Sequence, residues 1–173
     1  MADRSTILLK RAAMVNGGSA ALTFVVFMVL AGRVPPPGSA TSADRFALWA
    51  GLALWPSLIL FGMVGAVILA RGLGRAFNPL TDAESPFQRV SQRVLSNSVE
   101  QTLIFLPALA ALVALSPSAE LGAARAAVCL FALGRLLFWG GYLIHPFWRA
   151  PGMAMTLSTT LTVLAWAVLH ALG

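Results

Sequence analysis

The chain alternates five long apolar stretches with short polar connections. Each stretch is long enough to cross the roughly 30 Å hydrocarbon layer of a bilayer as a helix, which takes about 20 residues. No stretch alternates polar and apolar residues in the way that a half-buried β-strand does. We therefore expect an all-α, polytopic transmembrane helical bundle, with its helices over residues 12–31, 46–70, 86–115, 121–144 and 153–172.

The connections carry signals that end and begin helices. Residues 33–45 form a loop rich in Pro, Gly and Ser, and Ser116-Pro117-Ser118 interrupts the chain before the fourth stretch. Ser85 is a plausible N-cap for the third helix, Pro86 suits the first helical position, and Gln88 would complete a capping box. The first stretch could also be a signal peptide, but it exceeds the usual apolar core of about 7–15 residues, so we favour an uncleaved helix.

The basic residues are distributed unevenly between the two sets of connections, and this predicts an orientation. Cytoplasmic loops carry an excess of Lys and Arg. We therefore expect the N-terminus in the cytoplasm and the C-terminus outside, in a bacterial inner membrane. The side predicted to be cytoplasmic holds Arg4, Lys10, Arg11, Arg71, Arg75, Arg89, Arg93 and Arg149, and the other side holds Arg33, Arg45 and Arg125.

The composition excludes several classes of protein. Hydrophobic residues make up 58% of the chain and charged residues 10%, whereas a soluble domain is about one quarter charged. The formal net charge of +6 includes no dense basic run, so we expect no nucleic-acid binding. Cys129, the single cysteine, cannot form an intrachain disulfide, and we expect it to pack between helices rather than to react. We expect no metal site.

Polar residues cluster on one face of the third predicted helix. Arg93, Asn97 and Glu100 stand at i, i+4 and i+7, so their side chains project in the same direction. A carboxylate and an amide at the mouth of a membrane helix cost free energy unless polar groups meet them. A charged ligand or a polar neighbouring helix would supply such groups.

Two further groups lie on the same predicted side of the membrane. Arg135 and Tyr142 are seven residues apart and nearly in line on the fourth helix, and Arg149 follows in the next loop. Arginine binds carboxylates through a planar, bidentate fork. A matching ligand would carry carboxylates for the arginines and an ammonium group for the glutamate.

Each of these residues also has a structural explanation. Arg93 could mark the cytoplasmic end of a helix, and Tyr142 could belong to an interfacial aromatic belt. Asn97 could form a hydrogen bond between helices. Glu100 and Arg135 could form an intramembrane ion pair. The joint spacing favours a binding site over these separate roles.

Three motifs in order resemble those of the membrane-associated proteins in eicosanoid and glutathione metabolism, the MAPEG family. They are Arg93-x3-Asn97-x2-Glu100, the pair Arg135-x6-Tyr142, and Arg149 followed by Ala150-Pro151. The segment Ala76-Phe77-Asn78-Pro79 is similar to a loop of that family. The resemblance covers roughly residues 46–172, so we expect an N-terminal segment with an extra helix (1–45) and a four-helix domain (46–173).

The resemblance implies a homotrimer that binds glutathione, as a co-substrate, between neighbouring subunits near the cytoplasmic face. Arg93, Asn97 and Glu100 would hold the γ-glutamyl end, and Arg135 and Tyr142 would contact the peptide toward its glycine carboxylate. Arg149 matches the arginine that stabilises the thiolate. The implied activity is transfer of glutathione to a lipophilic electrophile, or reduction of a lipid peroxide, with the second substrate arriving from membrane lipid. The alternative is a non-catalytic lipid- or glutathione-binding protein of the same family.

Overall fold

The computed structural model describes residues 4–38, 41–75, 78 and 82–173, and this part of the chain is built from helices. All five long helices have the length and composition needed to cross a membrane, which confirms the all-α prediction. They are α1 (Arg4–Arg33), α2 (Ser42–Gly74), α3 (Pro86–Leu115), α4 (Gly122–Ile144) and α5 (Ala150–Leu172), with a short 3-10 helix, η1 (Ser118–Glu120), before α4.

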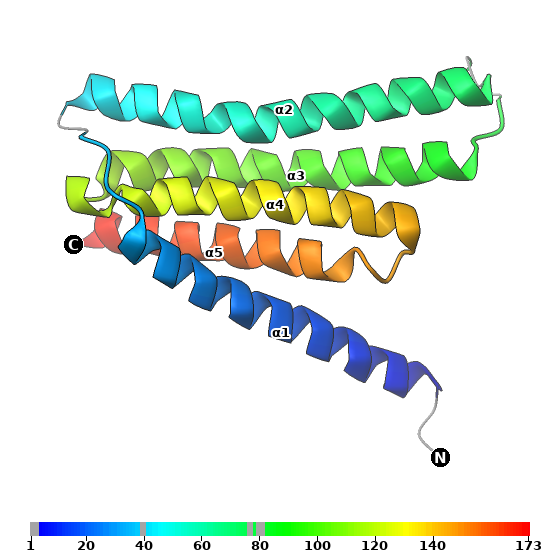
Figure 1. The fold of residues 1–173 in the computed structure, drawn as a ribbon, viewed down its shortest axis with the longest axis horizontal. Helices are drawn as coiled ribbons and strands as arrows, with labels where there is room; N and C mark the ends of the chain where they lie inside the picture. Colours follow the sequence, from blue (N-terminus) through cyan, green and yellow to red (C-terminus); the bar gives the residue numbers. More distant parts are fainter. Residues whose placement is uncertain (1–3, 39–40, 76–77, 79–81) are drawn as a thin grey trace.

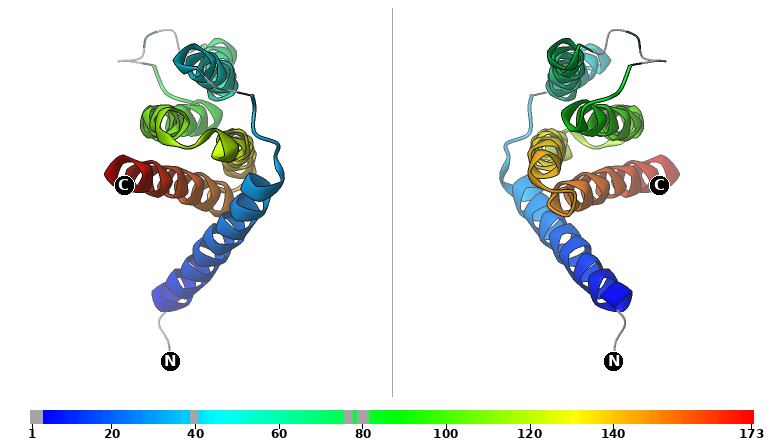
Figure 2. Two further views of the ribbon diagram at one scale, coloured as in Figure 1. Left: turned by 90° about the vertical axis from the view of Figure 1, so that its left-hand side faces the viewer. Right: turned by 90° about the vertical axis from the view of Figure 1, so that its right-hand side faces the viewer.

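The helices α2 to α5 run alongside one another, and α1 crosses them at an angle (Figure 1). The N-terminus lies at the same end of the bundle as the α2–α3 and α4–α5 connections, and we call this the N-terminal end. The C-terminus lies at the other end. End-on views place α1 and α2 on opposite sides of the bundle (Figure 2). In agreement, α1 contacts α4 and α5, whereas α2 contacts α3 and α4.

The start of α3 is close to the sequence prediction. Ser85 is the N-cap, and its Oγ accepts a hydrogen bond from the backbone N–H of Gln88 at 3.1 Å, with Pro86 at the first helical position. The predicted capping box is nevertheless only half formed. The Gln88 Oε1 atom is buried without a hydrogen-bond partner among the described residues, because the side chain lies inside the bundle rather than reaching back to the cap.

The core consists of two clusters of buried side chains. In the larger cluster, Phe105 of α3 stacks on Phe131 of α4 with ring centroids 4.0 Å apart. Phe27, fully buried in that cluster, fixes the C-terminal half of α1 and packs edge-on against Trp166 of α5. A smaller cluster nearer the N-terminal end includes Val94 and Tyr142.

Glycine allows α4 and α5 to approach closely beside the smaller cluster. A Cβ atom on Gly152 would lie 2.3 Å from the backbone nitrogen of Phe138, and one on Gly134 would lie 2.7 Å from Thr156. Any larger side chain would force the two helices apart. This approach holds the first turn of α5 against α4, which is where the candidate site lies.

Several large apolar side chains face outward from α2, as expected for a helix in contact with lipid. Leu54, Trp55 and Phe61 are all more than half exposed in the single chain. Cys129 is exposed as well, so the prediction that it packs between helices of the chain is wrong. Its neighbours Val128 and Leu130 are buried, so Cys129 lies on the exposed side of α4 in the single chain.

Candidate functional site

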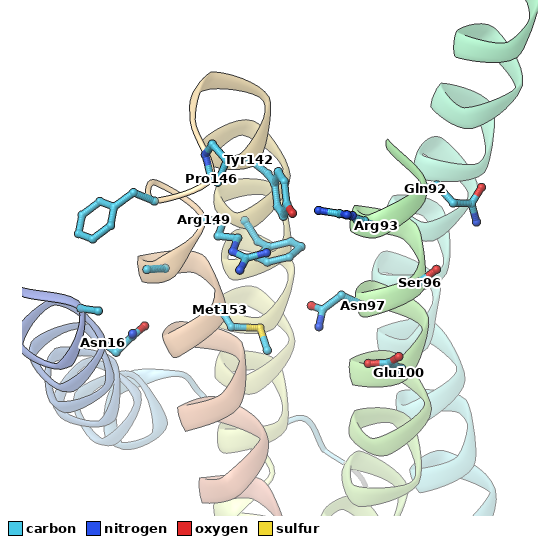
Figure 3. Close-up of a pocket in the computed structure, with 14 residues that line it drawn as sticks. Asn16, Gln92, Arg93, Ser96, Asn97, Glu100, Tyr142, Pro146, Arg149 and Met153 are labelled. Carbon is cyan, nitrogen blue, oxygen red and sulfur yellow. The ribbon is translucent and has the colours of Figure 1, made fainter. Parts of the chain in front are cut away.

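A pocket of about 650 Å³ opens at the N-terminal end of the bundle (Figure 3). Its volume falls within the roughly 300–1,000 Å³ that is usual for small-molecule sites. Residues from α1, α3, α4, α5 and the α4–α5 connection line it. They are Ala12, Asn16, Gln92, Arg93, Ser96, Asn97, Glu100, Phe138, Tyr142, Pro146, Phe147, Arg149, Ala150 and Met153.

Five of the six residues predicted from the sequence line this one pocket. Arg93, Asn97 and Glu100 come from successive turns of α3 and face the same cavity, as their spacing predicted. Tyr142 approaches from the last turn of α4, and Arg149 stands immediately before α5. In Figure 3 the three α3 side chains lie across the pocket from Arg149. The site therefore joins two guanidinium groups, a carboxylate, an amide and a phenol.

The α4–α5 connection holds Arg149 against Tyr142. The guanidinium carbon of Arg149 lies 4.8 Å from the centroid of the Tyr142 ring, within the range of a cation–π contact. Gly141 makes this geometry possible, because a Cβ atom there would lie 2.3 Å from the carbonyl oxygen of Trp148. The connection thus lies directly on α4, and the charge of Arg149 stays at the pocket.

Arg135, the sixth predicted residue, does not line the pocket but lies behind it. Its side chain is almost fully buried. The guanidinium donates to Asn97 Oδ1 at 2.9 Å, and also to the Thr156 hydroxyl. Its carbon lies 4.6 Å from the centroid of the Phe138 ring. In this arrangement Arg135 reaches the pocket only through the residues that it contacts.

The alternative ion pair between Glu100 and Arg135 is not formed among the described residues. The close contact between titratable side chains in this part of the chain joins His170 Nε2 and Glu120 Oε2, 2.9 Å apart near the C-terminal end. The carboxylate of Glu100 instead lines the cavity. It is thereby available to a cationic group of a ligand.

The bond from Arg135 orients the amide of Asn97. Since the Oδ1 atom accepts from a buried guanidinium, the Nδ2 group of Asn97 is left to donate elsewhere. Asn97 lines the pocket, so a ligand carboxylate or carbonyl is a suitable acceptor. The predicted hydrogen bond between helices is thus present, and it also prepares a donor for the cavity.

The contribution of α1 to the pocket was not predicted from the sequence. Ala12 and Asn16 form part of the pocket wall, although they lie far from the other lining residues in sequence. The available signal was a single amide inside an apolar helix, about 7.5 Å beyond Arg11 at 1.5 Å per residue. Asn16 reaches the pocket because α1 crosses the bundle at an angle, and the sequence does not show that angle.

Two further predictions concern a loop segment and a metal site. The segment Ala76-Phe77-Asn78-Pro79 falls, apart from Asn78, outside the described residues. The described residues include no group of three or more His, Cys, Asp or Glu side chains that could hold a metal ion.

Comparison with known families accounts for most of the chain. The sequence model of the MAPEG family matches residues 46–169, and the chain belongs to that family. The match includes all six predicted residues but leaves out α1. None of the curated proteins compared with the chain matches it.

Proposed function

We propose that this protein is a membrane-embedded glutathione transferase, which joins glutathione to a lipophilic electrophile or uses it to reduce a lipid peroxide. The observation that carries the proposal is the single pocket into which Arg93, Asn97, Glu100, Tyr142 and Arg149 all project. Membership of the MAPEG family supports a glutathione-related transferase or isomerase type of activity. The specific reaction and substrates are the proposal.

The charges of the pocket complement those of glutathione. The tripeptide carries two carboxylates, one ammonium group and a thiol, and the pocket offers Arg93 for a carboxylate, Glu100 for the ammonium group and Arg149 for the sulfur. Arg93 and Asn97 would hold the γ-glutamyl carboxylate through charge-assisted hydrogen bonds, and Glu100 would hold the ammonium group. Tyr142 would contact the peptide toward its glycine end. Arg135 supports this set through Asn97.

Arg149 is placed to activate the thiol. A thiol with an ordinary pKa near 8.5 is only about 3% ionised at pH 7, and the thiolate is the nucleophile. A guanidinium beside the sulfur favours the thiolate and lowers the pKa of the thiol. The contact with Tyr142 keeps this cation at the pocket before glutathione arrives.

The surroundings of the pocket fit a second substrate that is apolar. The helices that surround the site are those of a multi-pass membrane protein, and apolar side chains such as Phe147 and Met153 complete the wall. A lipophilic electrophile could reach the site from membrane lipid. We further propose that the pocket faces the cytoplasm of a bacterial inner membrane and that the protein assembles as a homotrimer.

The test follows glutathione bound to the detergent-purified protein through the ultraviolet absorbance of its thiolate. Wild type should show thiolate at neutral pH. Arg149→Ala should lose it while binding S-methylglutathione, which has no thiol, with nearly unchanged affinity. Arg149→Lys should restore part of the thiolate because it restores the charge. Arg89→Ala is the matched control, since Arg89 is exposed on α3 and does not line the pocket.

The outcomes separate the proposal from its alternative. Wild-type thiolate in the Arg149→Ala variant would mean that another group activates the thiol. Glutathione binding without thiolate in wild type would favour a non-catalytic binding protein. Absence of glutathione binding would refute the proposed function.

A further inference from the structure

We propose that the wall formed by α1 and the start of α5 is the subsite for the electrophile, and that it accepts a lipophilic carbonyl compound whose oxygen binds to Asn16. This assignment rests on the proposed function, because it places the second substrate beside bound glutathione. It concerns a helix that lies outside the MAPEG match.

The pocket has two chemically different sides. The α3 side carries Arg93, Asn97 and Glu100, and Figure 3 shows Asn16 on the opposite side, beyond Met153. Apart from its amide, the Asn16 side is apolar, with Ala12, Phe147, Ala150 and Met153. A charged tripeptide matches the first side. A mainly apolar molecule with one hydrogen-bonding group matches the second, and Arg149 lies between them.

The amide of Asn16 lacks a protein partner. Its side chain forms no hydrogen bond with any other described residue, although it belongs to a helix apolar enough to span the membrane. Asn16 is exposed in the single chain, and an unpaired amide costs free energy where lipid surrounds it. A ligand oxygen in the pocket would satisfy it, which gives the residue a reason to be there.

The orientation of α1 is fixed close to Asn16. The Ser158 hydroxyl of α5 donates to the backbone carbonyl of Ala20 at 3.0 Å. Ala12, Asn16 and Ala20 follow one another at intervals of four, so they share the face of α1 that meets α5. This contact lies one turn from Asn16, whose side chain lines the pocket.

An α,β-unsaturated ketone illustrates the chemistry that this geometry supports. The thiolate sulfur of glutathione forms a bond to the β carbon, and the π electrons of the carbon–carbon double bond move toward the carbonyl oxygen as an enolate. A proton from water then restores the ketone, so no leaving group is required. The Asn16 Nδ2 group would donate to the oxygen as its negative charge develops, and such a donor stabilises the transition state.

A kinetic comparison tests the role of Asn16. Wild type and Asn16→Leu are assayed with 4-phenyl-3-buten-2-one, which has a carbonyl, and with benzyl chloride, which has none. Loss of one hydrogen bond to an oxygen that becomes negatively charged should lower kcat/KM for the ketone by roughly ten- to a hundredfold. The rate with benzyl chloride and the affinity for S-methylglutathione should change less than twofold. Thr6→Leu, another polar-to-apolar change on an exposed position of α1, should leave both electrophiles unaffected.

Photolabelling locates the subsite without requiring turnover. Benzophenone is a lipophilic ketone that forms covalent bonds on irradiation, and mass spectrometry identifies the residues that it labels. Labels should fall around Ala12 and Asn16 and at the start of α5, and Asn16→Leu should reduce them severalfold. The competing site is a separate apolar groove of about 420 Å³ beside Leu137, Gly140 and Trp148.

The two measurements distinguish the possible failures. Labelling confined to the groove beside Gly140, or equal effects of Asn16→Leu on both electrophiles and on S-methylglutathione, would overturn the α1 subsite. If wild type binds no glutathione but benzophenone still labels α1 in an Asn16-dependent way, the proposed function fails and the carbonyl site stands.

Discussion

Replacing Arg135 with methionine should weaken glutathione binding without weakening the fold. Arg135 is almost fully buried, and the hydrogen-bond partners of its guanidinium among the described residues are neutral: the Asn97 amide, the Ser98 and Thr156 hydroxyls, and the Met153 sulfur. A buried cation without a carboxylate partner gains little to offset its loss of solvation. Methionine keeps an apolar stem between Phe131 and Phe138. The Thr156 hydroxyl retains the carbonyl oxygens of Gly152 and Met153, at 3.2 and 3.0 Å.

The expected loss of affinity comes from Asn97. One hydrogen bond to a charged group contributes about 1.5–3 kcal/mol, which is roughly ten- to a hundredfold in affinity. Asn97→Ala removes that bond directly. Arg135→Met removes the donor that orients the amide, so its effect should be at most equally large. If Arg135 acts only through Asn97, the double variant should bind no more weakly than Asn97→Ala alone.

The assay is calorimetric titration with S-methylglutathione of wild type, both single variants and the double variant in detergent. Effects of residues that act through one group do not add, whereas independent contacts do. A double variant that binds at least tenfold more weakly than Asn97→Ala would refute the indirect role and show that Arg135 touches the ligand. Denaturant titrations should place Arg135→Met within about 1 kcal/mol of wild type or above it, as is often found when apolar residues replace buried charges. A larger loss of stability would mean that the variant binds more weakly because its fold is damaged.

Three further predictions concern the scaffold and its assembly. Arg45→Ala should lower the free energy of unfolding by about 1–3 kcal/mol, because Arg45 donates to the carbonyl oxygens of Val113 and Ser116 at the end of α3. Arg125→Ala, which removes one exposed hydrogen bond of 3.3 Å, should change the free energy of unfolding little. Reporter fusions in the α1–α2 loop and at the C-terminus should both report the outer compartment, and a cytoplasmic C-terminus would contradict the charge-based orientation. Native mass spectrometry in mild detergent should detect trimers; monomers alone would contradict the predicted homotrimer.

The number and order of the helices could be predicted because membrane helices follow directly from apolar length. Their ends could not be predicted as well. The apolar stretch 46–70 lies inside the longer helix Ser42–Gly74. That helix begins at a capping box formed by Thr41 and Asp44, both of them polar. Hydropathy reports the part of a helix inside the bilayer, whereas caps and backbone hydrogen bonds determine where the helix begins.

The sequence predicted which face of a helix each site residue occupies, but not which neighbouring helix covers that residue. Spacing on a single helix predicted that Arg93, Asn97 and Glu100 share a face, since that depends only on helical periodicity. Spacing also put Arg135 and Tyr142 in line, but seven residues separate them by about 10.5 Å along the axis. Tyr142 reaches the pocket, whereas α5 covers Arg135. Which helix covers a given turn depends on close packing at Gly134 and Gly152, and one sequence does not show it.

The position of α1 suggests how one scaffold could accept different electrophiles. The residues proposed for glutathione all lie within the part matched to the MAPEG family, from residue 46 to residue 169. Asn16 and Ala12 lie outside it, on α1. This helix is attached to the core through Phe27 and through the backbone carbonyl of Ala20, which accepts from Ser158 of α5, and both attachment points follow Asn16 in the sequence. A change at Asn16 therefore leaves the guanidinium groups, Glu100 and the α4–α5 contact in place. Under the proposed arrangement, the choice of electrophile can vary through α1 while thiol activation by Arg149 is preserved, so the effects of Asn16→Leu and Arg149→Ala on kcat/KM should be separable by electrophile.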